Sequence, residues 1–248
     1  MILYIDCSVG VSGDMLLAAF CDMGLPLSLL RRQIDRLPLH VRLRFSRIRH
    51  ARLSAARLSI RAEPGNGHFP HHMEHILRWI QASSLKDSLK RNLSHLWKKL
   101  ATVEGEIHHV PWKEVVFHQL AGPDTMVSFL GFCVGLDYFD VRDVRISSVP
   151  LGNWHRDHDK GWFPAPGPAT RRLLSGFPIE RRNDRFEWTT PTGAAILSSF
   201  ARAIPAPPFS VLRVGCATGA LRSPRGESAL RLLLGDVQLL LDRRERTL

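Results

Sequence analysis

Three consecutive segments decide how the chain begins to fold. They are the stretch Ile2-Leu3-Tyr4-Ile5-Asp6, the turn Gly10-Val11-Ser12-Gly13-Asp14 and the run Met15–Met23. A short apolar run before a glycine-containing turn predicts a buried strand, and the apolar run after it predicts a helix that ends at Gly24. Backbone N–H groups at such a helix N-terminus can hold a phosphate or a carboxylate. The turn lacks the lysine of a P-loop and the glycine spacing of a dinucleotide-binding loop. We therefore expect a less specialised anion site, formed by Gly10, Ser12 and Gly13.

Further along the chain, hydrophobic periodicity predicts a mixture of helices and strands. Alternating apolar residues over 41–45 and 53–60 predict an antiparallel pair whose arginine-rich face lies in solvent. Helices are expected over 27–37, 72–82, 84–108, 124–138, 169–174 and 191–203, and further strands over 141–149, 211–214 and 229–234. A Pro/Gly-rich connection spans 150–168. The predicted fold class is α+β (mixed α/β): small mixed sheets flanked by helices in a single large domain, 1–235, followed by a charged tail, 236–248.

The composition of the 248 residues is that of an ordinary globular protein, with 44% apolar and 23% charged residues. The four cysteines lie far apart and form no CxxC pair, so neither a disulfide framework nor a thiolate zinc site is indicated. The first residues lack the basic segment of a signal peptide, and the longest apolar stretch, 126–136, is shorter than the roughly 20 residues that span a bilayer. We therefore expect a cytoplasmic protein without a membrane partner.

The formal net charge of +11 favours anionic partners such as nucleic acid, anionic lipid or phosphorylated small molecules. The arginines are spread along the whole chain, and no nucleic-acid-binding motif accompanies them. The aromatic residues, with Tyr4 and Tyr138 as the only tyrosines, form no stacking platform for single strands. We expect a solvated basic surface or a small anionic ligand, and no specific nucleic-acid partner.

The segment Gly67-His68-Phe69-Pro70-His71-His72-Met73-Glu74-His75, called the histidine segment below, concentrates candidate metal ligands. Neutral imidazole binds nickel, zinc and copper well. Helical spacing after Pro70 predicts His71 and His75 on one face at i and i+4, with His72 beside His75. The alternative is a solvated histidine-rich loop that binds no metal. The candidate ligands are His68, which lies in the preceding loop, His71, His72 and His75.

Two further groups of polar residues lie at predicted element ends. Asp6 at the end of the first strand and Asp14 in the first helical turn could bind a divalent ion; otherwise Asp6 forms a turn and Asp14 interacts with the helix dipole. Thr190, just before Pro191, has the position of an N-cap, and hydroxyls at the positive end of a helix also suit an anionic substrate. The candidate anion-binding residues here are Thr190, Thr192 and Gly193, and the alternative is ordinary capping.

Four stretches, Asp6–Met15, Phe117-His118, Pro164–Thr170 and Thr190–Leu197, form a pattern in their order and spacing. This pattern resembles the LarC family of nickel-insertion proteins, and the similarity runs from residue 2 to about residue 235. The resemblance implies a cytoplasmic, CTP-dependent cyclometallase of the lyase class. Such an enzyme inserts Ni²⁺ into pyridinium-3,5-bisthiocarboxylate mononucleotide and so makes the nickel-pincer cofactor of lactate racemase. By this resemblance, the histidine segment and His118 bind nickel, and the catalytic candidates are Asp6, Asp14, His118 and Asp124.

The chain departs from this family at several positions. Val116 and Gln119 stand where members usually have histidine and glutamate, Ser128 replaces an aspartate and Lys160 replaces a histidine. Full-length members also carry a C-terminal domain that holds CTP with Mg²⁺ or Mn²⁺. We therefore expect this chain to act with such a domain as a separate polypeptide, and homo-oligomerisation is left open. The alternatives are a non-catalytic nickel carrier or a divergent, inactive paralogue, and a basic RNA-associated protein, which the motifs do not support.

Overall fold

A mixed seven-stranded sheet runs through the computed structural model, which describes residues 1–50, 53–63, 69–117, 120–157, 161–164, 166–184, 186–219 and 229–237. In the described residues the strand order is β2 (Val41–His50), β3 (Leu53–Ala62), β10 (Ser210–Ala217), β11 (Leu230–Asp236), β1 (Ile2–Asp6), β4 (Asp143–Ile146) and β9 (Ala201–Arg202). Neighbours β1 and β4 are parallel, whereas β2 and β3, and β10 and β11, are antiparallel. The predicted α+β class is confirmed, although the main sheet is larger than expected.

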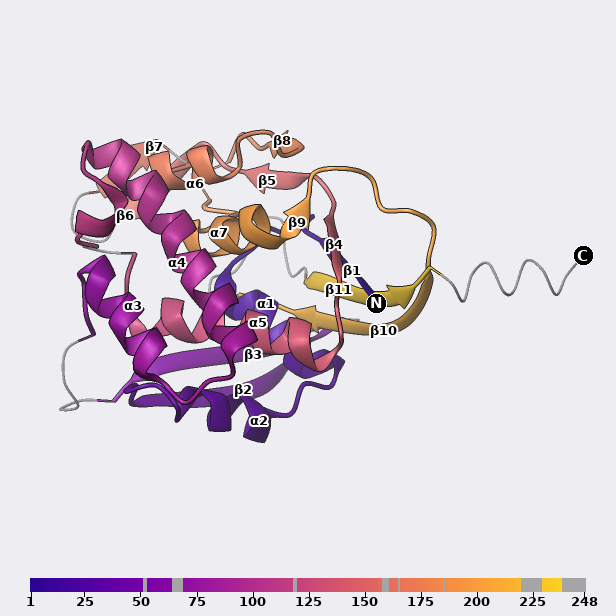
Figure 1. Cartoon of the computed structure of the whole chain (residues 1–248). Coiled ribbons are helices and arrows are strands. Elements are labelled where there is room, and N and C mark those ends of the chain that lie inside the picture. The colour runs from indigo at the N-terminus through magenta and orange to yellow at the C-terminus, as the bar shows by residue number, and fades with distance from the viewer. Residues whose placement is uncertain are drawn as a thin grey trace, which may run out of the picture.

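The helices of the described residues cover this sheet and pack on one another (Figure 1). They are α1 (Gly13–Met23), α2 (Leu27–Ile34), α3 (Met73–Ala82), α4 (Asp87–His108), α5 (Pro123–Tyr138), α6 (Pro168–Leu173) and α7 (Pro191–Phe200), with a short 3₁₀ helix at Trp112–Glu114. Each long helix was predicted to within a few residues, because its apolar positions repeat with helical spacing.

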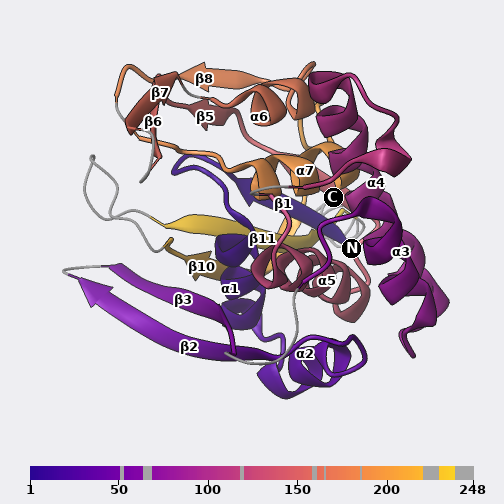
Figure 2. The same ribbon diagram turned by 90° about the vertical axis from the view of Figure 1, so that its left-hand side faces the viewer.

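The core lies where α1 packs between the sheet and α5. Gly215 of β10 has no room for a side chain, since a Cβ there would overlap the backbone oxygen of Ala19 in α1. Gly131 and Gly135 of α5 likewise make room for Leu17 and Phe20. Burying apolar surface at these contacts stabilises the fold by roughly 25 cal/mol for each Å² removed from water. Figure 2 shows the resulting order, with the β2–β3 hairpin below α1 and α5, and α7 above them.

Trp97 of α4 forms the centre of an aromatic cluster beside α5. Its ring lies 5.5 Å from that of Phe117 and 5.3 Å from that of Phe129, both edge to face. Trp97 is fully buried, and its indole N–H contacts the sulfur of Met126 at 3.3 Å. Such pairs add about 0.5–1.5 kcal/mol to the burial of the rings. Because Phe117 belongs to this cluster, the segment that leads to His118 is held against the core.

The Pro/Gly-rich connection is more ordered than the sequence predicted. It contains β5 (Val149–Leu151), which pairs in parallel with β8 (Ile179–Arg181), and the antiparallel pair β6 (Trp154–Asp157) and β7 (Gly161–Pro164). Their residues lack clear alternation, so periodicity alone could not identify such short strands.

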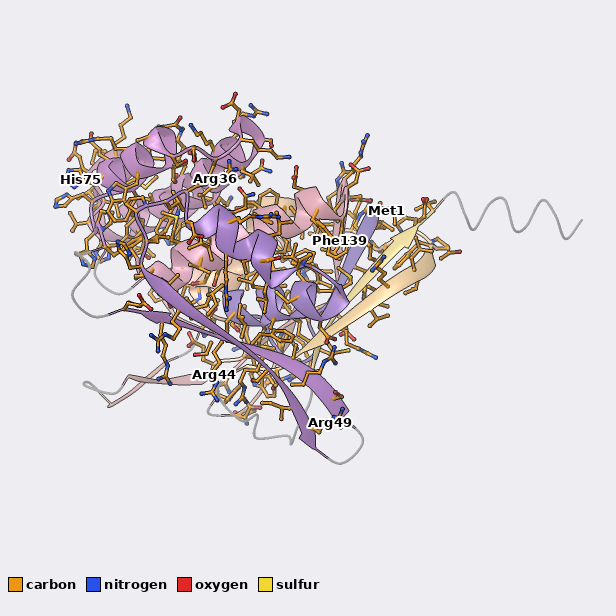
Figure 3. The ribbon with its side chains drawn as sticks, turned by 90° about the horizontal axis from the view of Figure 1, so that it is seen from below. Met1, Arg36, Arg44, Arg49, His75 and Phe139 are labelled. Atoms are coloured by element: carbon orange, nitrogen blue, oxygen red, sulfur yellow. The ribbon has the colours of Figure 1, made fainter. Side chains whose placement is uncertain are left out.

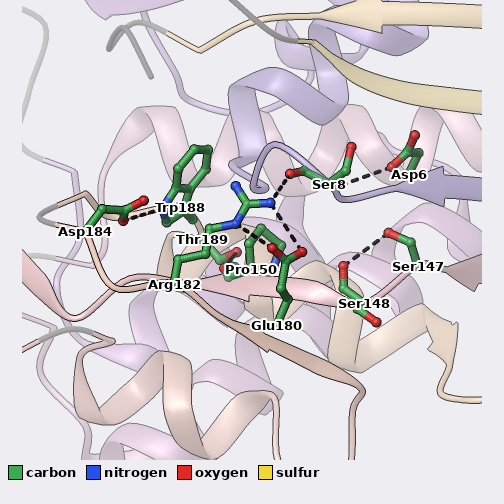
Figure 4. Close-up of polar contacts among 10 residues, drawn as sticks. All are labelled: Asp6, Ser8, Ser147, Ser148, Pro150, Glu180, Arg182, Asp184, Trp188 and Thr189. Carbon is green, nitrogen blue, oxygen red and sulfur yellow. Dashed lines mark hydrogen bonds and ion pairs between the residues drawn. The ribbon is translucent and has the colours of Figure 1, made fainter. Parts of the chain in front are cut away.

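Arg182 ties the β5–β8 layer to the first turn of the chain (Figure 4). Its guanidinium donates to the backbone oxygen of Ser8 at 2.6 Å and to Glu180 at 2.9 Å, and it stacks over the Trp188 ring at 4.1 Å. Trp188 in turn donates to Asp184 at 2.7 Å. This network holds the backbone around Trp188 next to the turn that begins α1. Within the described ranges, the chain has no helix with the length and apolar character needed to cross a membrane.

Candidate functional site

A cleft of about 870 Å³ opens between the β2–β3 hairpin and the first turns of three helices, α1, α5 and α7. This volume lies within the range of small-molecule sites, which is roughly 300–1,000 Å³. The residues that line the cleft come from five segments far apart in the sequence. They are Ser12, Gly13, Asp14, Arg42, Arg44, Ser46, Arg57, Leu58, Ser59, Ile60, Arg61, Leu120, Asp124, Thr125, Ser128, Thr190 and Thr192.

Two backbone segments that the sequence singled out lie side by side at the cleft. The N–H of Val11 donates to the oxygen of Trp188 at 2.9 Å, and the N–H of Thr190 donates to the oxygen of Val11 at 3.0 Å. Gly10 has a φ of +89°, and a Cβ there would overlap the backbone oxygen of Trp188. A Cβ on Gly193 would overlap the backbone oxygen of Val11. Gly10 and Gly193 do not line the cleft, so they act by letting the two segments approach.

The N-terminal parts of α1, α5 and α7 lie close together around Gly13. A Cβ on this residue would lie 2.6 Å from the Cβ of Ser128 in α5 and 2.8 Å from the Cγ2 of Thr192 in α7. Each helix carries a partial positive charge at this end and free N–H groups in its first turn. The predicted anion-binding residues Ser12, Gly13, Thr190 and Thr192 therefore share one cleft. Thr190 is also the N-cap that the sequence predicted, accepting the N–H of Gly193 at 3.2 Å.

Two carboxylates lie at this end of the cleft. Burial raises the pKa of Asp14 above its usual value, and the nearby Asp124 carboxylate adds to the rise, although hydrogen bonds from Ser12 and the Met15 backbone oppose it. The Ser12 hydroxyl donates to Asp14, and Asp124 is exposed in the first turn of α5. A carboxylate with a raised pKa accepts a proton more readily than an ordinary aspartate, so Asp14 has the character of a general base.

The arginines of the β2–β3 hairpin form the opposite wall, and the prediction that this face lies in solvent is confirmed for Arg42, Arg44 and Arg61, which are exposed in the open cleft, whereas Arg57 is half-buried. Among the described residues, the arginines that line the cleft are Arg42, Arg44, Arg57 and Arg61. The alternating sequence identified the arginine face correctly. Alternation shows which side chains share a face, but not which distant helix ends lie opposite that face.

Asp6 lies outside the cleft. Its carboxylate accepts the N–H of Ser8 at 3.1 Å and the Nε–H of Arg231 at 3.0 Å. Burial raises the pKa of Asp6, but these hydrogen bonds and the positive charge of Arg231 outweigh it, so the pKa lies below its usual value. Asp6 therefore stays ionised in its ion pair with Arg231 and links the turn after β1 to β11. Of the two candidate aspartates Asp6 and Asp14, only Asp14 lines the cleft among the described residues.

His71, His72 and His75 of the histidine segment are exposed, and the backbone of this segment pairs with the chain just before His118. The N–H of Phe117 donates to the oxygen of His71 at 2.9 Å, and the N–H of Met73 donates to the oxygen of Val115 at 3.0 Å. His72 is the N-cap of α3, so His71 precedes the helix, and the predicted helical i, i+4 pair of His71 and His75 is wrong. The pair that the fold does bring together is His72 and His75, whose rings lie 5.3 Å apart.

The other two histidines predicted to bind metal, His68 and His118, lie outside the described residues. Within the part of the chain that the structure describes, no three His, Cys, Asp or Glu side chains are grouped so as to hold a metal ion. In Figure 3, His75 lies at the outer edge of the molecule and Arg44 on the hairpin, so these two side chains lie apart. The chain between the histidine segment and the cleft is short, because Phe117 contacts the histidine segment and Leu120 lines the cleft.

Comparison with known proteins identifies the family. The nickel insertion protein family matches residues 3–247. The chain belongs to this family. The resemblance noted from the motifs is therefore confirmed, and nickel insertion is the family's role. No solved structure matches the chain.

Relatives whose names contain the words nickel insertion protein match almost all of this chain. One from Geotalea uraniireducens is 33% identical over 245 residues, which are 97% of this chain and 62% of that protein. One from Geotalea daltonii is 32% identical and one from Citrifermentans bemidjiense 35% identical, over 98% and 94% of this chain and 63% and 61% of those proteins. The chain thus spans about three fifths of the length of these relatives.

Two of the departures from the usual family residues fall on described residues. Val116 is the antiparallel bridge partner of His72, so both side chains project from the same face, and Val116 is 38% exposed. A histidine at 116 would therefore lie beside His72 and His75. Ser128 contacts the Gly13 corner of the cleft, so an aspartate there would add a third carboxylate. Gln119 and Lys160 lie outside the described residues.

Proposed function

We propose that this chain captures nickel on the histidine segment and inserts it into a small anionic acceptor held in the cleft. The observation that carries the proposal is the continuity of the two regions: the backbone of Phe117 binds that of His71, and Leu120, three residues later, lines the cleft. Three residues of extended chain cover at most about 11 Å. Nickel bound near His118 would thus lie close to a ligand in the cleft.

Nickel capture would use the imidazoles of the histidine segment. His71, His72 and His75 are exposed, and the rings of His72 and His75 lie within 5.3 Å of each other. His68 precedes His71 by three residues in the sequence, and His118 directly follows Phe117, whose backbone pairs with that of His71, so both are further candidate ligands. Neutral imidazole favours nickel over manganese and cobalt, as the usual order of divalent-metal affinity requires. In this proposal nickel is the cargo of the protein.

Insertion would use the carboxylates of the cleft. A cyclometallation replaces a ring C–H bond of the acceptor by a carbon–nickel bond and releases one proton. Asp14, with its raised pKa, would accept this proton, and exposed Asp124 would pass it to solvent. Ser12 would hold the Asp14 carboxylate in place through its hydroxyl. Asp6 would contribute indirectly, by fixing the turn on which these residues lie.

The family resemblance supports a more specific form of the proposal. The acceptor would be pyridinium-3,5-bisthiocarboxylate mononucleotide, and the product the nickel-pincer cofactor of lactate racemase. CTP with Mg²⁺ or Mn²⁺ would bind to a C-terminal domain supplied as a separate polypeptide. The relatives are longer than this chain by about two fifths of their length.

A reconstituted assay tests this function. The chain, a C-terminal domain from a longer relative, Ni²⁺, CTP and the acceptor are mixed, and the nickel-containing product is measured by mass spectrometry and by activation of lactate racemase. Asp14→Asn should lower the rate of insertion at least tenfold without changing nickel binding, since it removes the base alone. Asp35→Asn, an exposed aspartate at the end of α2, is the matched control and should leave the rate unchanged.

Each alternative has its own result in this assay. Nickel binding without any insertion, even with the C-terminal domain present, would support a non-catalytic nickel carrier. Insertion by residues 1–248 alone with CTP would contradict the two-polypeptide form of the proposal. Equal nickel affinity in the wild type and in the variant with His71, His72 and His75 replaced by alanine would contradict capture by the histidine segment.

A further inference from the structure

The β2–β3 wall of the cleft has a feature that nickel insertion by itself does not require. Residues opposite each other in an antiparallel pair project from the same face. The register pairs Arg42 with Arg61, Arg44 with Ser59 and Ser46 with Arg57, and all six side chains line the cleft. The wall is therefore a continuous polar surface of guanidinium and hydroxyl groups.

These arginines differ from other arginines of the fold, which have close carboxylate partners. Arg145 pairs with Asp143 at 2.8 Å, Arg182 with Glu180 at 2.9 Å, and Arg47, on the other face of β2, with Asp22 at 2.5 Å. On the cleft wall, Arg42 has a long contact of 3.5 Å with exposed Glu63.

Among the described residues, no carboxylate forms an ion pair with Arg44, Arg57 or Arg61, and the Nε of half-buried Arg57 has no hydrogen-bond partner. A buried donor without a partner is destabilising, and a bound anion would offset this cost.

The charges of the two walls determine which way an anionic ligand is oriented. The helix N-termini carry partial positive charge, but Asp14 and Asp124 already occupy their first turns with carboxylates. The arginine wall carries full positive charges, and its one contact with a carboxylate among the described residues is that of Arg42 with Glu63, which does not line the cleft. A phosphate monoester, with close to two negative charges at neutral pH, is therefore bound better at the arginine wall. Guanidinium groups also match phosphate oxygens through paired, parallel hydrogen bonds.

We propose that Arg44, Arg57 and Arg61 form a phosphate subsite, which binds the phosphate of a pyridine mononucleotide and directs the ring toward Asp14 and the helix N-termini. The inference rests on the proposed function in one respect, namely that the ligand of the cleft is the nickel acceptor. The subsite itself depends on the geometry and charge of the hairpin. In this proposal, the arginine face of the hairpin sets the orientation of the ligand in the cleft.

Binding of commercially available probes to the full chain tests the subsite. The probes are nicotinic acid mononucleotide, the nucleoside that lacks its phosphate, and inorganic phosphate, each measured by isothermal titration calorimetry without nickel. The mononucleotide should bind at least tenfold more tightly than the nucleoside, and phosphate should compete with it. Arg57→Gln should weaken mononucleotide binding at least tenfold and leave nucleoside binding unchanged.

Arg49→Gln is the matched control, because it removes the same charge from the same hairpin. Arg49 is exposed on the other face of β2 and outside the cleft, as the register shows, and Figure 3 places it near the end of the hairpin, away from Arg44. It should change mononucleotide affinity less than twofold. Circular dichroism would establish that each variant folds, and Arg44→Gln, at an exposed position of the same wall, replaces Arg57→Gln if that variant does not fold.

Three results would overturn the phosphate subsite: equal affinity for mononucleotide and nucleoside, no binding of either, or wild-type affinity in both arginine variants. A ten-residue oligoribonucleotide that binds a hundredfold more tightly than the mononucleotide would also overturn it, in favour of a polymer site. Nickel binding, titrated separately with Ni²⁺ alone, reports on the proposed function. If nickel does not bind but the mononucleotide does, the proposed function is contradicted and the phosphate subsite is supported. If nickel binds but the mononucleotide does not, only the phosphate subsite is contradicted.

Discussion

The cleft and the histidine segment are two chemically rich regions that the fold treats in opposite ways. The cleft is assembled from segments more than 100 residues apart and depends on backbone contacts such as those between Val11 and Thr190. The histidine segment is local in sequence, its described imidazoles are exposed, and they do not form a three-ligand group. The cleft is thus preorganised for a ligand, whereas the histidine segment provides accessible donors at little structural cost.

In the proposed function, one domain both collects a metal and holds an organic acceptor, and this difference between the two regions suits the two tasks. A site for an anion needs fixed charges around a defined volume, and such charges are held best by packed helices and strands. Metal capture benefits from exposed ligands that can exchange. The predictions that follow separate the two regions by their effects on stability, nickel affinity and pH dependence.

The largest effect is expected at the turn that forms the cleft. Gly10→Ala should lower the free energy of unfolding by about 3 kcal/mol or more, because a Cβ would overlap the Trp188 oxygen at a φ of +89°. The matched control is Gly176→Ala, where φ is +83° but no atom lies within 4 Å of the added Cβ. It should cost only about 1–2 kcal/mol of conformational strain. Denaturant unfolding followed by circular dichroism measures both, and equal losses would show that close approach at Gly10 is unimportant.

The next largest effect concerns the position that faces His72. Val116→His should bind Ni²⁺ roughly tenfold more tightly than the wild type, equivalent to about 1.4 kcal/mol, because it adds a third imidazole beside His72 and His75. Val211→His, at an exposed valine of β10, is the control and should leave the affinity unchanged. Calorimetric titration with nickel provides the measurement. If both substitutions have the same effect, the bridge between residues 72 and 116 does not create a ligand group.

Smaller effects on the free energy of unfolding, opposite in sign to each other, are expected from replacing Asp14 and Asp6. The pKa of Asp14 is raised in the folded chain, so its ionised form opposes folding above that pKa, and the penalty disappears as pH falls toward the unfolded value near 3.8. Asp14→Asn should therefore stabilise the protein at pH 7 and lose this advantage in acid. The pKa of Asp6 is lowered, so its contribution is present above the unfolded value and lost as pH falls through the folded one.

Asp6→Asn should accordingly destabilise the protein at pH 7, with a difference that shrinks toward pH 3. Unfolding free energies of the two variants and the wild type between pH 3 and pH 7 form one experiment. The same sign of change for both variants at pH 7 would contradict the assignment of Asp14 to the cleft and of Asp6 to a structural ion pair.

The smallest effect on stability is expected in the histidine segment. Replacing His71, His72 and His75 by alanine should change the free energy of unfolding by less than about 0.5 kcal/mol, because these side chains are exposed and the backbone bonds of the segment remain. Nickel affinity should fall, while binding of nicotinic acid mononucleotide stays at the wild-type level. A variant that loses mononucleotide binding would show that the two regions are coupled and not separate.

Much of the site was predictable from residue type and spacing. Thr190 was identified as an N-cap because threonine before proline has that role locally, and the turn around Gly13 because it follows an apolar run. His71 was placed wrongly, since helical spacing cannot show that the helix begins two residues later, where backbone bonds to Val115 and Phe117 hold the preceding chain extended.

The amino-acid sequence alone determined the α+β class, the positions of the long helices and the family, because periodicity, capping and ordered motifs are properties of neighbouring residues. The tertiary structure alone decided that the arginines of β2 and β3 lie opposite Asp14 and the helix N-termini. It likewise decided that Asp6 pairs with Arg231, 225 residues away, and that Val116 lies beside His72. Such pairings depend on how packed elements close distant loops, and no local pattern encodes which surfaces will meet.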